Sequence, residues 1–103
     1  MRPKKAVTKG AVVKTLNLQR DRIREKFKVK EIGLFGSFAR GNPKKRSDID
    51  ILVEFEPDYE TFDNYMELKF FLEEILKAKV DLVIKDAVRK ELRERILSEA
   101  VYV

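Results

Sequence analysis

The part of the chain that decides the fold reads GSFARGNPKKRSDIDILVEF, over residues 36–55. Its second half alternates apolar and polar side chains, which is typical of a half-buried β-strand. A strand is therefore predicted from Asp48 to Phe55. An earlier β-type run, residues 31–36, ends at the pair Gly36-Ser37, where Ser37 is expected to cap one helical turn. The core of the fold is thus predicted as strand, turn and strand.

Further elements follow on both sides of this unit. Apolar residues at helical spacing predict helices over residues 11–27 and 62–77, and a third strand is predicted over residues 80–84. Asp86 is expected to cap a last helix that runs to about residue 98, with Val88, Leu92 and Ile96 facing inward. Residues 100–103 are interpreted as a short fourth strand. This order predicts one α/β (α+β) domain, with a small mixed sheet of three or four strands packed against helices.

The composition limits which side chains could take part in catalysis. The 103 residues are 44% hydrophobic and 40% charged, which suits a single globular domain. The sequence contains neither cysteine nor histidine, so thiol nucleophiles, His-based triads and zinc–histidine sites are excluded. Any catalysis must use carboxylates, lysines, hydroxyls and recruited metal ions. No apolar run suits a membrane span or a secretory signal, so a cytoplasmic location away from membranes is expected.

Charge is unevenly distributed. Residues 1–30 carry a net charge of +9, and residues 31–103 carry −4. We expect residues 1–9 to form a basic flexible tail and residues 10–103 to form the domain. The basic third of the chain is interpreted either as a contact for nucleic acid or an acidic partner, or as a solvated helix face.

Two features suggest a phosphate and metal site. At Gly36-Ser37, the glycine allows close approach of a ligand to the backbone, and the Ser37 hydroxyl offers a donor to a phosphate oxygen. Alternatively, Ser37 only caps a helix. Asp48 and Asp50 are two apart on a strand, so their carboxylates share one face and suit Mg²⁺ or Mn²⁺. The alternative is a strand face that is simply solvated.

Asp81 is the third candidate. It alternates out of phase with the apolar residues of the strand predicted over residues 80–84. If that strand pairs beside residues 48–55, Asp81 reaches the same carboxylate cluster. The alternative is a solvent-facing aspartate without such a role.

Together, GSFARG over 36–41, SDIDILV over 47–53 and VDLV over 80–83 resemble the minimal nucleotidyltransferase (MNT) family of the DNA polymerase β-like superfamily. The resemblance runs from about residue 31 to the C-terminus and implies the palm-type core of that superfamily. It implies that Gly36 and Ser37 hold the β- and γ-phosphates of a nucleotide. It also implies that Asp48 and Asp50 bind two Mg²⁺ ions, with Mn²⁺ as an alternative, while Asp81 completes the metal site and helps to deprotonate the acceptor.

Basic residues lie in the first of these motifs and in the segment that follows it. Arg40 is interpreted as a phosphate contact or as the partner of a neighbouring carboxylate. Lys44 and Lys45 are interpreted as attracting a triphosphate or an acidic acceptor, or as part of a solvated loop.

The resemblance also implies a biological role. Minimal members are commonly encoded beside a helical HEPN protein, and act as antitoxins by transferring AMP from ATP to a tyrosine of that toxin. We expect the same here, since the chain ends directly after the core. One alternative is a nucleotide-binding module that neutralises its partner by masking it. Another is nucleotidyl transfer to an RNA end, in which the basic N-terminal helix would bind the RNA backbone.

The helix over residues 62–77 carries more apolar surface than one sheet requires. Phe62, Met66 and Phe70 form a second stripe, about 100° around the helix from the first. This stripe is interpreted as an interface with a partner or with a second copy of the chain. The alternative is a helix wedged between two packed elements.

Overall fold

The computed structural model describes residues 8–39 and 48–103, without the side chains of residues 37 and 38. A mixed four-stranded sheet has the order β3-β2-β1-β4, in which β2 pairs parallel to β3 and β1 pairs antiparallel to β2 and β4. This confirms the expected fold class. The elements are α1 (Lys9–Phe27), β1 (Val29–Phe35), α2 (Gly36–Ala39), β2 (Ile49–Phe55), α3 (Phe62–Leu76), β3 (Val80–Ile84), a 3₁₀ turn η1 (Lys85–Ala87), α4 (Lys90–Glu99) and β4 (Val101–Tyr102).

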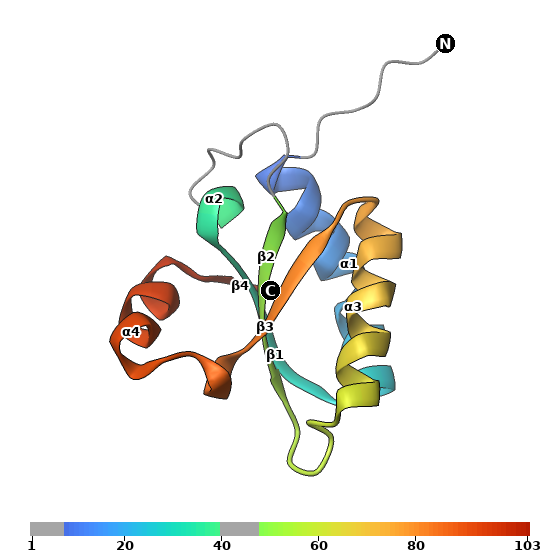
Figure 1. The fold of residues 1–103 in the computed structure, drawn as a ribbon. Helices are drawn as coiled ribbons and strands as arrows, with labels where there is room; N and C mark the ends of the chain where they lie inside the picture. Colours follow the sequence, from blue (N-terminus) through green and yellow to red (C-terminus); the bar gives the residue numbers. More distant parts are fainter. Residues whose placement is uncertain (1–7, 40–47) are drawn as a thin grey trace.

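The sheet separates two unequal layers (Figure 1). Helices α1 and α3 cover one face, and α4 lies on the opposite side. Alternate residues of β2, namely Ile49, Ile51 and Val53, are fully buried in the core under α1 and α3. The alternate residues Asp50, Leu52 and Glu54 belong to the face on the α4 side, where Leu52 is buried and the two acidic residues are half-buried. The alternation in the sequence therefore sets which face of β2 carries the polar chemistry.

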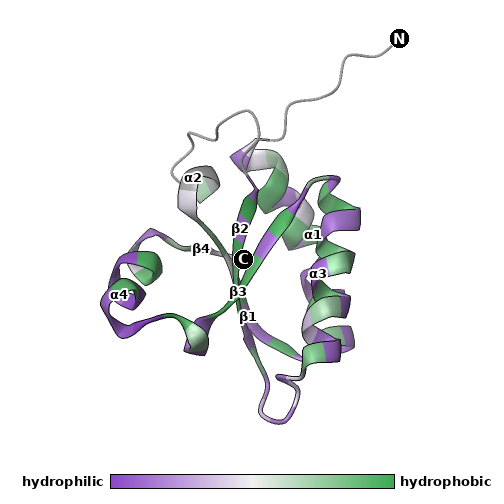
Figure 2. Ribbon diagram, in the orientation of Figure 1, coloured by the Kyte–Doolittle hydropathy of each residue, from purple (hydrophilic) through white to green (hydrophobic). Residues whose placement is uncertain are grey.

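The hydropathy of the chain follows this division (Figure 2). Hydrophobic residues run along the central strands, and the loop between β2 and α3 is hydrophilic. Each fully buried leucine or isoleucine contributes about 1.5–3 kcal/mol by leaving water. None of the helices in the described ranges has the length and hydrophobicity that a membrane-crossing segment requires.

The first helix starts earlier than expected. Thr8 is its N-cap, and the Oγ1 of Thr8 accepts a hydrogen bond of 3.1 Å from the backbone N–H of Ala11. Because this bond satisfies a free N–H at the helix end, the helix begins at Lys9 rather than at Ala11. The last residue of the predicted tail therefore belongs to α1, and residues 1–7 lie outside the described part of the chain.

The prediction for the last helix was partly wrong. Asp86 does not cap it but lies in η1, and the extended Val88 separates η1 from α4. Helix α4 then begins at Lys90, after Arg89. The guanidinium of Arg93 donates to the carbonyls of Asp86 and Val88, at 3.4 and 3.3 Å, which stabilises the turn. Leu92 was expected to face inward, but it is 48% exposed.

Candidate functional site

Asp50 and Asp81 lie side by side. The parallel register of β2 and β3 pairs Asp50 with Asp81, so the Cα atoms of the two residues are about 4.8 Å apart. Both residues alternate with core residues of their own strands, which places them on the sheet face away from α1 and α3. Asp50 is half-buried and Asp81 is exposed. The condition for Asp81 to reach the other carboxylates, that its strand pairs beside β2, is thus met.

Gly36 lies directly against Asp50. β1 pairs Phe35 with Asp50, and the next residue, Gly36, turns the chain into α2 with φ of +73°. A Cβ atom at Gly36 would lie 3.0 Å from Cγ of Asp50 and would clash with its Oδ2. The absence of a side chain therefore leaves the room that the Asp50 carboxylate occupies. This turn therefore holds the backbone in close contact with the Asp50 carboxylate.

Ser37 differs from the expectation in one respect. The helical turn starts at Gly36, so Ser37 lies inside α2 and is not its N-cap. Glycine can adopt the positive φ that starts the turn without a steric penalty, which explains why the turn begins one residue earlier. The side chain of Ser37 lies outside the described part of the structure, as do Arg40, Lys44 and Lys45.

Asp48 immediately precedes β2 and is exposed. The chain is held here by the N–H of Ile49, which donates to the carbonyl of Lys79 at 2.9 Å. Across residues 8–39 and 48–103, no three acidic, cysteine or histidine side chains are grouped so that they could hold one metal ion. The oxygen donors of Asp48, Asp50 and Asp81 are of the type that Mg²⁺ prefers, and their shared role stays a prediction.

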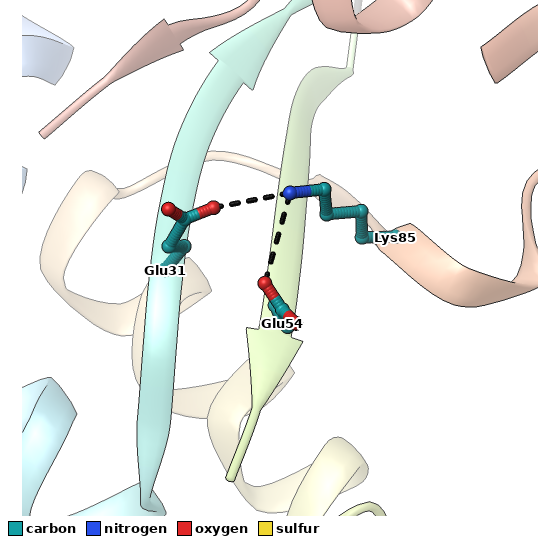
Figure 3. A network of polar contacts seen from close by, with 3 residues as sticks. All are labelled: Glu31, Glu54 and Lys85. Atoms are coloured by element: carbon teal, nitrogen blue, oxygen red, sulfur yellow. Dashed lines mark hydrogen bonds and ion pairs between the residues drawn. The ribbon is translucent and has the colours of Figure 1, made fainter.

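A polar network occupies the other end of the same sheet face (Figure 3). The Lys85 ammonium lies 3.2 Å from Oε2 of Glu31 on β1 and 3.7 Å from Oε1 of Glu54 on β2. It also lies 5.9 Å from the ring centroid of Tyr102 on β4. Lys85 follows directly on β3, so its ammonium connects all four strands. The members of this network are far apart along the chain, so no spacing in the sequence predicts it.

The network affects the protonation of Lys85. The hydrogen bond from Lys85 to Glu31 raises the pKa of the lysine above its ordinary 10.5, against the opposing effect of partial burial. The charges of Tyr102, Glu31 and Glu54 act in the same direction as the hydrogen bond. Lys85 is therefore cationic throughout the neutral range and holds the two glutamates beside each other.

The carboxylate pair on adjacent strands offers oxygen ligands of the kind that a divalent cation prefers, beside a glycine turn that opens a helix. The family model of the nucleotidyltransferase domain matches residues 16–103. The chain therefore belongs to the nucleotidyltransferase family, a family of transferases.

Its relatives have more specific names. The chain is 42% identical over 88 residues to protein adenylyltransferase MntA of Thermococcus cleftensis, an alignment that covers 85% of this chain and 88% of that protein. A protein of Methanocaldococcus jannaschii, whose name also describes a protein adenylyltransferase, is 46% identical over 83 residues. That alignment covers 79% of this chain and 83% of the relative.

Solved structures agree with the fold. One described as a minimal nucleotidyltransferase superposes with a TM-score of 0.72 at 34% identity, over 86% of this chain and 93% of that chain. A toxin–antitoxin structure with AMP-PNP gives a TM-score of 0.65 at 30% identity, over 91% of this chain and 70% of that one. A complex of a tri-AMPylated HEPN toxin from Shewanella oneidensis with its MNT antitoxin gives 0.57 at 28% identity, over 91% and 66%.

Proposed function

We propose that this protein transfers AMP from ATP to a tyrosine hydroxyl of a HEPN-type toxin, and thereby acts as the antitoxin of that toxin. The observation that carries the proposal is the juxtaposition of Asp50, Asp81 and Gly36 at one end of the sheet. The names of the relatives, which are adenylyltransferases and toxin–antitoxin complexes, support the acceptor class.

The triphosphate is assigned to the turn between β1 and α2. Gly36 brings backbone close to the ligand, and Ser37 adds a donor to the β- and γ-phosphates. Arg40, Lys44 and Lys45 are assigned to the rim, where their positive charge attracts the triphosphate. The adenine base is assigned by analogy with the relatives alone.

Asp48, Asp50 and Asp81 would hold two Mg²⁺ ions, or Mn²⁺ in their place. Bound magnesium neutralises the triphosphate and stabilises the attacking and leaving oxygens. Carboxylates held side by side repel each other unless a cation lies between them, which agrees with the registered pair Asp50 and Asp81. ATP and Mg²⁺ are both available in the cytoplasm, the expected location.

The reaction is a displacement at the α-phosphorus of ATP. The tyrosine oxygen forms a bond to the α-phosphorus, and the bond from that phosphorus to the oxygen bridging to the β-phosphate breaks. Pyrophosphate leaves with that oxygen. A carboxylate oxygen of Asp81 accepts the proton of the attacking hydroxyl. The toxin tyrosine then carries an AMP group through a phosphodiester bond.

The test is a labelling experiment with ATP labelled at the α-phosphate. The purified protein is incubated with labelled ATP, Mg²⁺ and lysate of its source organism, and the products are treated with protease or nuclease. We expect a protease-sensitive labelled band that ATP labelled at the γ-phosphate does not produce. Mass spectrometry of that band is expected to find AMP on a tyrosine.

The matched variants are Asp50→Asn/Asp81→Asn, expected to abolish the label, and Asp86→Asn, an exposed aspartate outside the site, expected to retain it. Nuclease-sensitive label would overturn the acceptor class in favour of an RNA end. If the double variant transfers no label but still neutralises the toxin, the mechanism is masking of the toxin and not catalysis.

A further inference from the structure

Helix α3 presents different sides to the core and to solvent. Leu68 and Leu72 are fully buried in the core, which holds the helix against the sheet. Phe62 is 76% exposed and Phe70 is 59% exposed, with the half-buried Met66 between them. The alternative of a helix wedged between two packed elements is therefore wrong for this apolar stripe among the described residues, and the role of the stripe as an interface stays a prediction.

A third side of α3 reaches the edge strand β3. The hydroxyl of Tyr65 donates to the carbonyl of Leu82 at 2.6 Å, and Oε2 of Glu73 accepts from the N–H of Val80 at 3.1 Å. Tyr65 and Glu73 are eight residues apart, which is two steps of four, so they stand in one row along the helix. Both hydrogen bonds are partly buried. The row therefore attaches β3 to a helix that is itself fixed in the core.

The two hydrogen bonds enclose Asp81, which lies between Val80 and Leu82. The N–H of Ile49 on β2 donates to the carbonyl of Lys79 at 2.9 Å, so the backbone groups of Lys79 face β2. Successive residues of a strand turn their backbone groups to alternate sides, so those of Asp81 also face β2, and those of Val80 and Leu82 face away from it. The backbone on either side of Asp81 is thus held from α3.

Asp50 and Asp81 differ in their support. Asp50 lies on β2, which has β1 on one side and β3 on the other. β3 is the last strand of the sheet, and on its outer side the described residues contribute no further strand. There the hydrogen bonds from Tyr65 and Glu73 hold the backbone instead.

We propose that Tyr65 and Glu73 are positioning residues for Asp81. They hold the backbone of β3 at the place where the Asp81 carboxylate lies beside that of Asp50. The inference rests on the proposed function, in which these carboxylates bind Mg²⁺. Groups that orient a metal ligand from outside the coordination sphere typically change metal affinity by about 10–100-fold. Tyr65 and Glu73 act through the backbone, so the lower end of that range is expected.

Binding of Mn²⁺ to the purified full chain tests the proposal, with the free ion measured by electron paramagnetic resonance. Asp81→Asn gives the binding that remains without this carboxylate. Tyr65→Phe/Glu73→Leu removes both hydrogen bonds and is expected to bind Mn²⁺ about tenfold more weakly than the wild type. All proteins are compared at a temperature at which circular dichroism shows them folded. If the double variant does not fold, Tyr65→Phe alone, expected to bind about threefold more weakly, provides the test.

Two matched variants separate positioning from general stability. Glu73→Gln retains an oxygen that accepts from the N–H of Val80, so it is expected to bind Mn²⁺ as the wild type does, while Glu73→Leu binds more weakly. Lys85→Met removes the ion pairs that lie four residues further along the chain from Asp81. It is expected to lower stability without weakening Mn²⁺ binding, because loss of a positive charge does not disfavour a cation.

Full Mn²⁺ affinity in Tyr65→Phe/Glu73→Leu, or in Tyr65→Phe where that variant provides the test, would overturn the proposal. So would an equal loss of affinity in Lys85→Met, or a loss in Glu73→Gln as large as in Glu73→Leu. A wild type that binds no more Mn²⁺ than Asp81→Asn would also overturn it. The titration requires neither ATP nor a toxin. If the variants behaved as expected but the wild type transferred no AMP, the positioning would stand and the proposed function would fail.

Discussion

The Asp50 carboxylate occupies the space where a side chain at Gly36 would begin, so any other residue at position 36 requires Asp50 to move. Gly36 also has φ of +73°, a conformation that costs other residues about 1–2 kcal/mol. One glycine therefore turns β1 into α2 and leaves room for a carboxylate of β2. The geometry of the site depends on that turn.

Gly36→Ala is expected to displace Asp50 and to reduce nucleotide transfer about a hundredfold, since a shift of about 1 Å in a catalytic group has an effect of that order. The variant should still fold, with a lower melting temperature. The matched control is Gly10→Ala, because Gly10 is exposed on α1 and has free space around its Cα. That change should leave transfer intact and keep or slightly raise stability. Full activity of Gly36→Ala would show that the contact with Asp50 has no role in the site.

Asp81→Asn tests the carboxylate pair through stability alone. In the wild type, Mg²⁺ is expected to raise the melting temperature, because a cation that binds only the folded state stabilises it. Without the ion, removal of one of two adjacent negative charges should leave stability equal or higher. The Mg²⁺-induced rise should fall sharply in Asp81→Asn and persist in Asp86→Asn. Equal Mg²⁺-induced rises in all three proteins would exclude Asp81 as a ligand.

The sequence predicted the parts of the fold that follow from local alternation. The apolar residues of β2 point to the core as expected, and Asp81 lies out of phase on β3. The pairing of Asp50 with Asp81 requires β2 and β3 to be neighbours, which alternation within either strand does not determine.

Other features depend on contacts between distant residues. The turn before α4 is held by Arg93, which donates to the carbonyls of Asp86 in η1 and of Val88 after it. The sequence alone favours Asp86 as the cap of that helix. The Lys85 network joins residues 31, 54 and 85, which no spacing rule connects. The roles of Arg40, Lys44 and Lys45 stay predictions, because those residues lie outside the described structure.

Lys85→Met tests whether the network stabilises the sheet. Because the folded pKa of Lys85 is raised, its contribution is fully present below the ordinary value of 10.5 and is lost as the pH rises through the raised pKa. At neutral pH the variant should be about 1 kcal/mol less stable, since the Lys85 side chain is 27% exposed and partly screened. That difference should shrink above a pH of about 10.5. Lys90→Met, an exposed control, should match the wild type at every pH, and a pH-independent loss in Lys85→Met would assign the effect to packing.

The outer edge of β3 is protected by two side chains of α3. The hydroxyl of Tyr65 donates to the carbonyl of Leu82 at 2.6 Å, and Glu73 accepts from the N–H of Val80 at 3.1 Å. Both backbone groups point away from β2, toward the open side of β3. Unpaired backbone groups on such an edge strand can pair with a strand of another chain. The side chains of α3 therefore take the place of a further strand.

Tyr65→Phe/Glu73→Ala should remove this protection. Loss of the two hydrogen bonds should lower stability by about 1–3 kcal/mol, because the backbone groups remain partly buried without partners. The greater effect should be on association, since the freed edge can pair with the edge of another molecule. Light scattering at a temperature below unfolding should show aggregation of this variant, while Tyr59→Phe, a change in the exposed β2–α3 loop, should stay clear. If the double variant lost stability without aggregating, the two side chains would hold α3 to the sheet but would not guard the edge.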